Sequence, residues 1–383
     1  MKTLYDYKPN WKETRERYAA WWKGKSLGRP MLSFRVRREE VSRLDENEES
    51  PPPPAPWDYV NIGKTVADYR KQAANRAWPV ESFPCLHVVP GLPLLAEYYG
   101  AMPEFRPGTV WYAAVFPDGY PISDLTAQPI DHHPRLAIHE AMLKRAAELA
   151  GPAFPVGIPD LMERMDTLAA LRGMQEFCYD FFDRPGEVKT ACHHLDIAWE
   201  TAYDRMYEAV KFSAENPGQN PKADEGSAWV AFGVWSQGRT AKLQCDFAAV
   251  MNPEQFEEFA LPGLRRQCAH VDTSFFHLDG KDALKHADAV LSLERLGALQ
   301  WTPGAGQPDG ANERWWPLYH KARAAGKALW IYLVDGSVDQ QIAAADRLIG
   351  EIGPEGLYLH FYFEFSEAEA ADFIKRAETK WKC

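Results

Sequence analysis

The sequence predicts an α/β fold, in the form of a (β/α)8 TIM barrel with an N-terminal helical extension and inserted loops. Eight short apolar runs alternate with helical patterns, centred near residues 32, 86, 156, 243, 275, 299, 331 and 360. The length of 383 residues suits one such barrel with extra segments. No GxGxxG or GxxxxGK[ST] loop follows any run, which weakens a dinucleotide-binding or P-loop interpretation. An open sheet in two halves is the second choice. We expect a single domain over residues 1–383.

The first part of the chain shows this pattern less clearly. Residues 10–25 place four aromatic side chains among charges, which predicts an amphipathic helix on the outside of the body, within an extension over residues 1–28. A first strand is expected at 31–36. The acidic and proline-rich stretch 44–56 that follows is typical of a surface loop.

Between the first strand and residue 135 the predicted elements are few. We expect a helix over 58–77 and a strand over 85–89. Residues 100–129 are rich in aromatics, prolines and glycines without a clear period. Their length suits a segment that covers a binding face.

From residue 135 onward the alternation becomes regular. Strands are expected at 154–158, 241–245, 273–277, 298–301, 328–334 and 357–363, and helices at 135–150, 166–180, 185–214, 253–270, 315–325, 338–351 and 366–380. Ser366 and Glu369 predict a capping box at the start of the last helix. The polar stretch 215–226 resembles an inserted loop.

Composition excludes several classes of protein. A net charge of −11 and a pI near 5.5 argue against a nucleic-acid partner, because binding phosphates needs a clustered basic surface. No apolar run is long enough to span a bilayer and the first residues are polar, so we expect a cytoplasmic protein without a membrane partner. Six cysteines without CxxC spacing indicate neither a disulfide framework nor a thiolate zinc cluster. The 14 tryptophans suit stacking on flat ligands or packing in a large core.

The most informative stretch is 275–306, which reads as strand, turn, helix and strand. Its polar residues fall where the strands end, with His277 and Asp279 on the first strand and Gln300 and Trp301 on the second. Ligands bind at the carboxyl ends of parallel strands in such folds. The simpler interpretation is that Asp279 and Gly280 form a turn and that His277 is a hydrogen-bonded core histidine.

Residues 243–266, LQCDFAAVMNPEQFEEFALPGLRR, resemble the family of uroporphyrinogen decarboxylase and its relatives, in which a strand with a polar end precedes a loop and a similar helix. The order of the later strand ends fits the same family, with His277-x-x-Gly280, then Gln300-Trp301, then Asp335-Gly336. The resemblance covers about residues 150–380. It implies a (β/α)8 barrel.

The family has two main activities. One branch decarboxylates acetate side chains of a tetrapyrrole without a cofactor and binds the substrate through an arginine-rich N-terminal segment. Here residues 31–38 read MLSFRVRR, a departure that disfavours this alternative although Arg35, Arg37 and Arg38 keep it open. The other branch moves methyl groups between a corrinoid on a separate small protein and a thiol or folate. The resemblance therefore favours a methyltransferase that demethylates a small substrate with a corrinoid protein, and it implies a homodimer.

Methyltransferases of this family hold a zinc ion through a His-x-Cys strand end and a later cysteine. This sequence departs from that pattern with His277-x-Asp279, and the later position falls at His360. The resemblance implies that these three side chains bind a divalent metal, most readily zinc, and leave one coordination position open. Without a thiolate the metal would be a harder Lewis acid, suited to an oxygen donor or to iron or manganese. The alternative is that no metal binds and that these residues contact the substrate directly.

The remaining candidate residues also lie at predicted strand ends. We expect catalytic roles for Asp279, His277 and Asp246, and substrate contacts from Asp160, Cys245, Gln300, Trp301, Asp335, Tyr362 and Glu364. For Cys245 a buried structural thiol is the alternative. Strand-end carboxylates together with the tryptophans also suit a carbohydrate-active hydrolase, which needs two carboxylates in reach of one bond. A non-catalytic binding barrel is a further alternative.

Overall fold

A computed structural model of the protein describes residues 2–37, 61–88, 94–106, 109–116, 120–214 and 225–383. Its centre is a seven-stranded sheet with the order β2-β1-β11-β10-β9-β8-β7. The strands are β1 (Met31–Arg37), β2 (Arg76–Ala77), β7 (Thr240–Leu243), β8 (Thr273–Asp279), β9 (Ala298–Thr302), β10 (Ala328–Leu333) and β11 (Leu357–Phe365). All neighbours are parallel except the pair of β1 and β2. The predicted α/β class is therefore confirmed.

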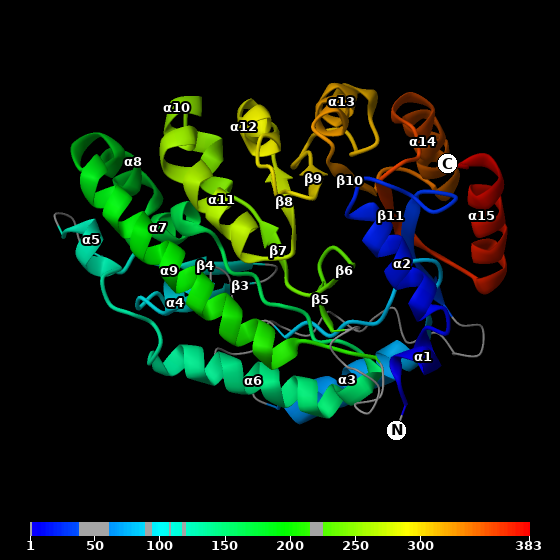
Figure 1. Cartoon of the computed structure of the whole chain (residues 1–383), viewed down its shortest axis with the longest axis horizontal. Helices are drawn as coiled ribbons and strands as arrows, with labels where there is room; N and C mark the ends of the chain where they lie inside the picture. The colour runs from blue at the N-terminus through cyan, green and yellow to red at the C-terminus, as the bar shows by residue number, and fades with distance from the viewer. Residues whose placement is uncertain (1, 38–60, 89–93, 107–108, 117–119, 215–224) are drawn as a thin grey trace.

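Helices follow the strands and form an arc outside them (Figure 1). In the second half these are α10 (Pro253–Gln255), α11 (Leu261–His270), α12 (Ala287–Leu291), α13 (Trp316–Ala324), α14 (Val338–Ile352) and α15 (Glu367–Lys380). A π-helical segment, Phe256–Ala260, interrupts the predicted helix over 253–270. It lies directly before α11, which has Pro262 in its first turn. Proline lacks the N–H that a continuous α-helix would use there.

The first half is mostly helical in the described residues. Its helices are α1 (Leu4–Tyr7), α2 (Trp11–Trp21), α3 (Ile62–Ala74), α4 (Leu94–Glu97), α5 (Ile122–Leu125), α6 (Pro134–Ala150), α7 (Arg164–Arg172), α8 (Met174–Asp183) and α9 (Pro185–Val210). Two small antiparallel hairpins complete the structure, β3 (Pro103–Arg106) with β4 (Thr109–Tyr112) and β5 (Gly226–Trp229) with β6 (Val234–Gln237). The predicted loop over 44–56 lies outside the described residues, as do residues 215–224 of the predicted insertion.

Six of the eight predicted strands are β1 and β7 to β11. The runs near residues 86 and 156 do not form continuous strands and meet in one parallel bridge between Leu86 and Val156. Prolines explain the interruption, because Pro84 and Pro155 flank the bridge and have no N–H to donate to a ladder. The backbone of this region still approaches the sheet, since the amide of Glu81 donates to the Leu32 carbonyl at 3.3 Å.

Helix α2 is the amphipathic helix predicted for residues 10–25, with one face packed against the amino end of the sheet and Lys12, Glu13 and Glu16 exposed on the other. Trp11 and Trp21 are fully buried. The indole of Trp21 donates to the carbonyl of Leu329 near the start of β10 at 3.3 Å, and the hydroxyl of Tyr18 lies 3.3 Å from that of Tyr358 near the start of β11. The carboxyl ends of the strands are the opposite end, where polar side chains gather.

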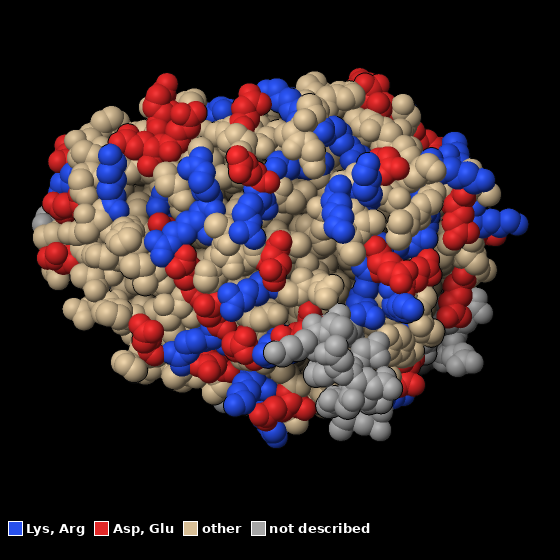
Figure 2. Space-filling view, in the orientation of Figure 1, with Lys and Arg blue, Asp and Glu red and all other residues tan. Residues whose placement is uncertain are grey.

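The surface carries both signs of charge. On the face shown in Figure 2, basic and acidic side chains are interspersed, so that face has no continuous basic patch of the kind that phosphates need. Within the described part of the chain, no helix is long and apolar enough to cross a membrane. Tryptophans such as Trp11, Trp235, Trp301 and Trp381 are fully buried, which supports the core interpretation of this residue type.

Candidate functional site

Strand alternation places the candidate residues on one face of the sheet. Along β8, His277 and Asp279 share a face, whereas Phe276 and Leu278 are buried on the other. In the parallel register His277 pairs with Gln300 of β9. The predicted neighbours His277, Asp279 and Gln300 are therefore brought together at the carboxyl ends of β8 and β9.

His277 is held in one orientation. Its Nδ1 hydrogen-bonds to the side-chain oxygen of Gln300, and the amide group of Gln300 in turn donates to the hydroxyl of Thr302 at 3.0 Å. Because an amide oxygen only accepts, Nδ1 carries the hydrogen, and the unprotonated Nε2 lies 4.0 Å from Oδ2 of Asp279. Burial, and to a lesser extent the charge of nearby Lys242, lower the pKa of His277 to about 4. His277 is thus a neutral, oriented imidazole.

A buried ion pair stands beside this histidine. The ammonium of Lys242 on β7 pairs with Oδ2 of Asp160, and the side chain of Lys242 is only 4% exposed. Nζ of Lys242 also lies 5.8 Å from the ring centroid of Trp229. The second oxygen of Asp160 is buried without a hydrogen-bond partner. The site therefore contains one cation whose position is fixed by a predicted substrate-binding carboxylate.

Asp246 adds a further carboxyl group just after β7. It accepts a hydrogen bond from the side-chain amide of Gln244 at 3.0 Å. Burial, together with the charges of Asp166, Asp279 and Asp160, raises the pKa of Asp246 to about 7 against the opposing effect of Lys242. The carboxyl groups of Asp160, Asp246 and Asp279 therefore lie in one neighbourhood, and their catalytic and substrate-binding roles stay predictions.

Two buried acids in this region were not predicted. Glu163 is the N-cap of α7, and Asp166 lies in the first turn of that helix. Together with Cys245 they form a cluster whose potential ligand atoms lie within 4.8 Å of one another. Asp166 accepts the backbone amides of Asp246 at 3.0 Å and Phe247 at 2.7 Å. Burial raises the pKa of Glu163 and of Asp166, and also that of the Cys245 thiol. An acid-x-x-acid pair after a predicted strand was the available signal, but it is also typical of helix capping.

The three residues predicted to bind a metal, His277, Asp279 and His360, do not form such a cluster. His360 lies on β11, where its Nδ1 shares a hydrogen bond with the hydroxyl of Ser33 at 2.6 Å and its ring stacks on Trp330 at 5.4 Å. Strands β9 and β10 separate it from His277 and Asp279 on β8. Of the residues that the structure describes, Glu163, Asp166 and Cys245 form the one group of three potential ligands at metal-binding spacing. A zinc ion at His277, Asp279 and His360 does not fit this arrangement.

Trp301 packs against Trp315, just before α13, which corrects its expected role as a substrate contact. It is fully buried, and its ring lies 5.1 Å from that of Trp315. Alternation explains the difference, because Gln300 and Trp301 are adjacent on β9 and must point to opposite faces. Asp335 accepts the backbone amide of Asp309 at 3.1 Å and lines a hollow of about 450 Å³ beside α14, so its expected substrate contact stays a prediction.

The remaining predicted contacts lie at the end of β11. Tyr362 is 54% exposed, and the guanidinium of Arg35 lies 5.3 Å from its ring centroid. Glu364 is exposed and pairs in register with Arg35 of β1. The side chain of Arg37 and all of Arg38, which would support a carboxylate-binding segment, lie outside the described residues. Arg35 is thus the one arginine of that segment that the structure places near the strand ends.

Comparison with known proteins gives a fold and no family. No family model and no curated protein matches the chain. Among solved structures, a methyltransferase from Methanosarcina mazei has the same overall fold with a TM-score of 0.59 and 13% sequence identity. The match covers 96% of this chain and 98% of the other. At this identity the likeness shows the fold alone, and membership of the uroporphyrinogen decarboxylase family stays a prediction.

Proposed function

We propose that the protein is an enzyme of the methyltransferase type, which removes a methyl group from a small substrate at the carboxyl ends of the parallel strands. The observation that carries the proposal is the arrangement of Lys242, Asp160, His277 and Gln300 at that end of the sheet. The full-length likeness to a methyltransferase supports the same class. Because a fold alone does not define a reaction, the roles below are inferred from the side chains.

The reaction breaks the bond between a methyl carbon and a substrate heteroatom. The bonding electron pair stays on that heteroatom. Without a proton donor, a methyl ether would therefore leave an alkoxide, and a methyl thioether would leave a thiolate. In the proposal, the ammonium of Lys242 donates a proton to this heteroatom, and Asp160 holds the ammonium in place. A corrinoid on a partner protein, implied by the sequence resemblance, would supply the nucleophile that accepts the methyl group.

The other residues orient and surround the substrate. His277 is neutral, so its Nε2 can accept a hydrogen bond from the substrate without adding charge, and Gln300 fixes the plane of its ring. Asp279 and Asp246 border the same space. No step is assigned to a metal ion, because the ligands expected for it lie apart. We further propose that the sheet closes into a (β/α)8 barrel that forms one domain, and that the protein assembles as a homodimer.

Methyl transfer to free cob(I)alamin tests the proposal. A panel of small methyl ethers, thioethers and methylamines is incubated with the protein, and formation of methylcobalamin is followed by absorbance. We expect activity with at least one compound class, and Lys242→Met should lower the rate by about 100-fold, the usual effect of losing a general acid. Lys281→Met is the matched control, because Lys281 is exposed and pairs with Asp282. No transfer by the wild type, or equal rates in both variants, would contradict the proposal.

A second candidate function is hydrolysis of a glycosidic bond. It is favoured by the grouping of Asp246 with Asp160 and Asp279, since such enzymes use two carboxyl groups in different protonation states. The burial of the tryptophans removes one of the arguments for it. Release of nitrophenol from chromogenic glycosides by the wild type, abolished by Asp246→Asn, would favour this alternative over methyl transfer.

A further inference from the structure

We propose that the protein binds one zinc ion through Glu163, Asp166 and Cys245. The site lies at the junction of α7 with the end of β7, and it is distinct from the set His277, Asp279 and His360. It is independent of the methyl-transfer reaction, because its evidence is the geometry and chemistry of the three ligands. A carboxylate oxygen, a second carboxylate oxygen and a thiolate are all groups that zinc accepts.

The ligand atoms already lie near the positions that zinc requires. They are within 4.8 Å of one another. With metal bonds of about 2.0–2.3 Å in a tetrahedron, the ligand atoms would be about 3.3–3.8 Å apart. Each pair therefore needs to close by only about 1–1.5 Å at most, which side-chain rotation can provide.

The second observation is an unsatisfied oxygen of Glu163. The residue is 3% exposed, and its Oε2 is buried without a hydrogen bond of normal geometry. The polar neighbour of this carboxylate is the thiol of Cys245, the third member of the cluster. Its other oxygen accepts the backbone amide of Asp166 at 2.9 Å, so the carboxylate cannot turn away without losing the cap of α7. A buried carboxylate oxygen that lacks a donor is costly, and a bound cation would satisfy it.

Asp166 is fixed in a similar way. Its two oxygens accept the backbone amides of Asp246 and Phe247, the two residues that follow Cys245. A carboxylate has further lone pairs beyond these two hydrogen bonds, so it can also bind a metal. Hydrogen bonds to the ligands from the surrounding backbone are typical of zinc sites, because they hold each ligand in position.

The charge balance also suits a divalent cation. Two carboxylates and a thiolate carry three negative charges when zinc is bound. Arg164 and Lys242 supply positive charge nearby. The charge of Arg164 lowers the pKa of Glu163, and the charge of Lys242 lowers that of Asp166. The mixture of two oxygen ligands and one sulfur ligand favours a borderline ion such as zinc over magnesium or calcium, which prefer oxygen alone.

Titration with Co²⁺ as a spectroscopic probe tests the site without any activity assay. The titration uses the chain with Cys178 and Cys383 replaced by serine, because these are the two thiols that are not fully buried. We expect one equivalent of Co²⁺ to produce a near-ultraviolet charge-transfer band from the thiolate, and zinc to displace it. Cys245→Ser should abolish the band. Glu163→Gln, which preserves the shape of the side chain, should weaken binding at least 10-fold.

Matched controls separate the site from general effects. Cys268→Ser replaces another buried cysteine outside the cluster, and Glu97→Gln replaces another buried glutamate, so both should retain the band and the affinity. Circular dichroism of each variant confirms folding. Absence of metal uptake by the parent chain would overturn the proposal. Binding that survives Cys245→Ser but is lost in His277→Ala would overturn it in favour of the strand-end histidine.

Discussion

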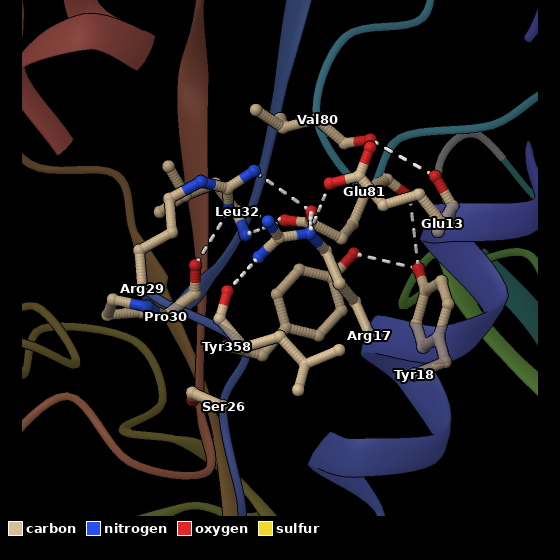
Figure 3. A network of polar contacts seen from close by, with 12 residues as sticks. Glu13, Arg17, Tyr18, Ser26, Arg29, Pro30, Leu32, Val80, Glu81 and Tyr358 are labelled. Atoms are coloured by element: carbon tan, nitrogen blue, oxygen red, sulfur yellow. Dashed lines mark hydrogen bonds and ion pairs between the residues drawn. The ribbon is translucent and has the colours of Figure 1, made fainter. Parts of the chain in front are cut away.

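Arg29 and Glu81 form a bidentate ion pair in the interior of the protein. Nη1 of Arg29 donates to Oε2 of Glu81 at 2.9 Å and Nη2 donates to Oε1 at 3.0 Å, with side-chain exposures of 5% and 1% (Figure 3). Oε2 of Glu81 also accepts the backbone amide of Leu32 in β1 at 2.7 Å. The pair therefore holds the segment before the Leu86 bridge against the edge of the sheet.

Glu81→Gln should destabilise the protein strongly, because it leaves the guanidinium of Arg29 buried without its anion. Removing one partner of a buried ion pair typically costs about 3–5 kcal/mol. Urea denaturation followed by tryptophan fluorescence measures the change in the midpoint. Asp68→Asn is the control, since the pair of Lys64 and Asp68 is exposed and its loss should leave the midpoint unchanged. Equal midpoints in the wild type and Glu81→Gln would contradict this account.

The second half of the fold was predictable because its strands are continuous apolar runs. The stretches that became β8, β9 and β10 contain no proline, and strong helix signals follow them. The runs near residues 86 and 156 have the same apolar character, but Pro84 and Pro155 remove ladder donors. The contact with β1 there comes from Glu81, an acid that no pattern of hydrophobicity could identify as a buried residue.

The capping box at the start of α15 was predicted from the sequence and is confirmed. The side chain of Ser366 accepts the backbone amide of Glu369 at 3.3 Å, and Glu369 accepts the amide of Ser366 at 2.8 Å. Ser366→Ala should lower the free energy of unfolding by about 1 kcal/mol, the usual effect of losing an N-cap. Ser292→Ala provides the comparison, because the hydroxyl of Ser292 donates to the Ala289 carbonyl and does not cap the start of a helix. A loss of the same size in both variants would argue against a capping effect.

Trp301 should contribute to stability and not to ligand binding. Trp301→Ala removes a fully buried ring that packs against Trp315, and such a truncation typically costs about 3–5 kcal/mol. Tyr362→Ala is the counterpart on the exposed end of β11 and should change stability much less. Thermal unfolding of both variants decides the matter. If Trp301→Ala leaves the melting temperature unchanged, the ring does not have the packing described.

The candidate site shows where sequence reasoning reaches its limit. His277, Asp279 and Gln300 could be predicted because they lie on neighbouring strands at the same level. Trp301 was misplaced, since a strand end was identified but the face of each residue was not. Glu163 and Asp166 were missed because they follow an interrupted strand, and their approach to Cys245 depends on long-range packing of α7 against the loop after β7.

Glu97 should make the stability of the protein depend on pH. This carboxyl group is buried with Arg135, whose guanidinium lies 2.5 Å away, and it accepts the hydroxyl of Tyr112 at 2.9 Å. Burial outweighs both contacts and raises the pKa of Glu97 from 4.5 to about 7. His139, at 3.8 Å, adds no charge at neutral pH because burial lowers its pKa to about 4.

A raised pKa in the folded state means that the folded protein binds the proton more tightly than the unfolded chain. The contribution of Glu97 is therefore fully present below about pH 4.5 and is lost as the pH rises through about 7. The shift corresponds to about 3 kcal/mol. Glu97→Gln removes this titration but also the anion beside Arg135, so the prediction concerns the trend with pH. The free energy of unfolding of the variant, minus that of the wild type, should increase from pH 5 to pH 8. Denaturation midpoints of both proteins at several pH values measure the gain. Glu148→Gln, at an exposed position, should follow the wild type, and parallel pH profiles for all three proteins would refute the assignment to Glu97.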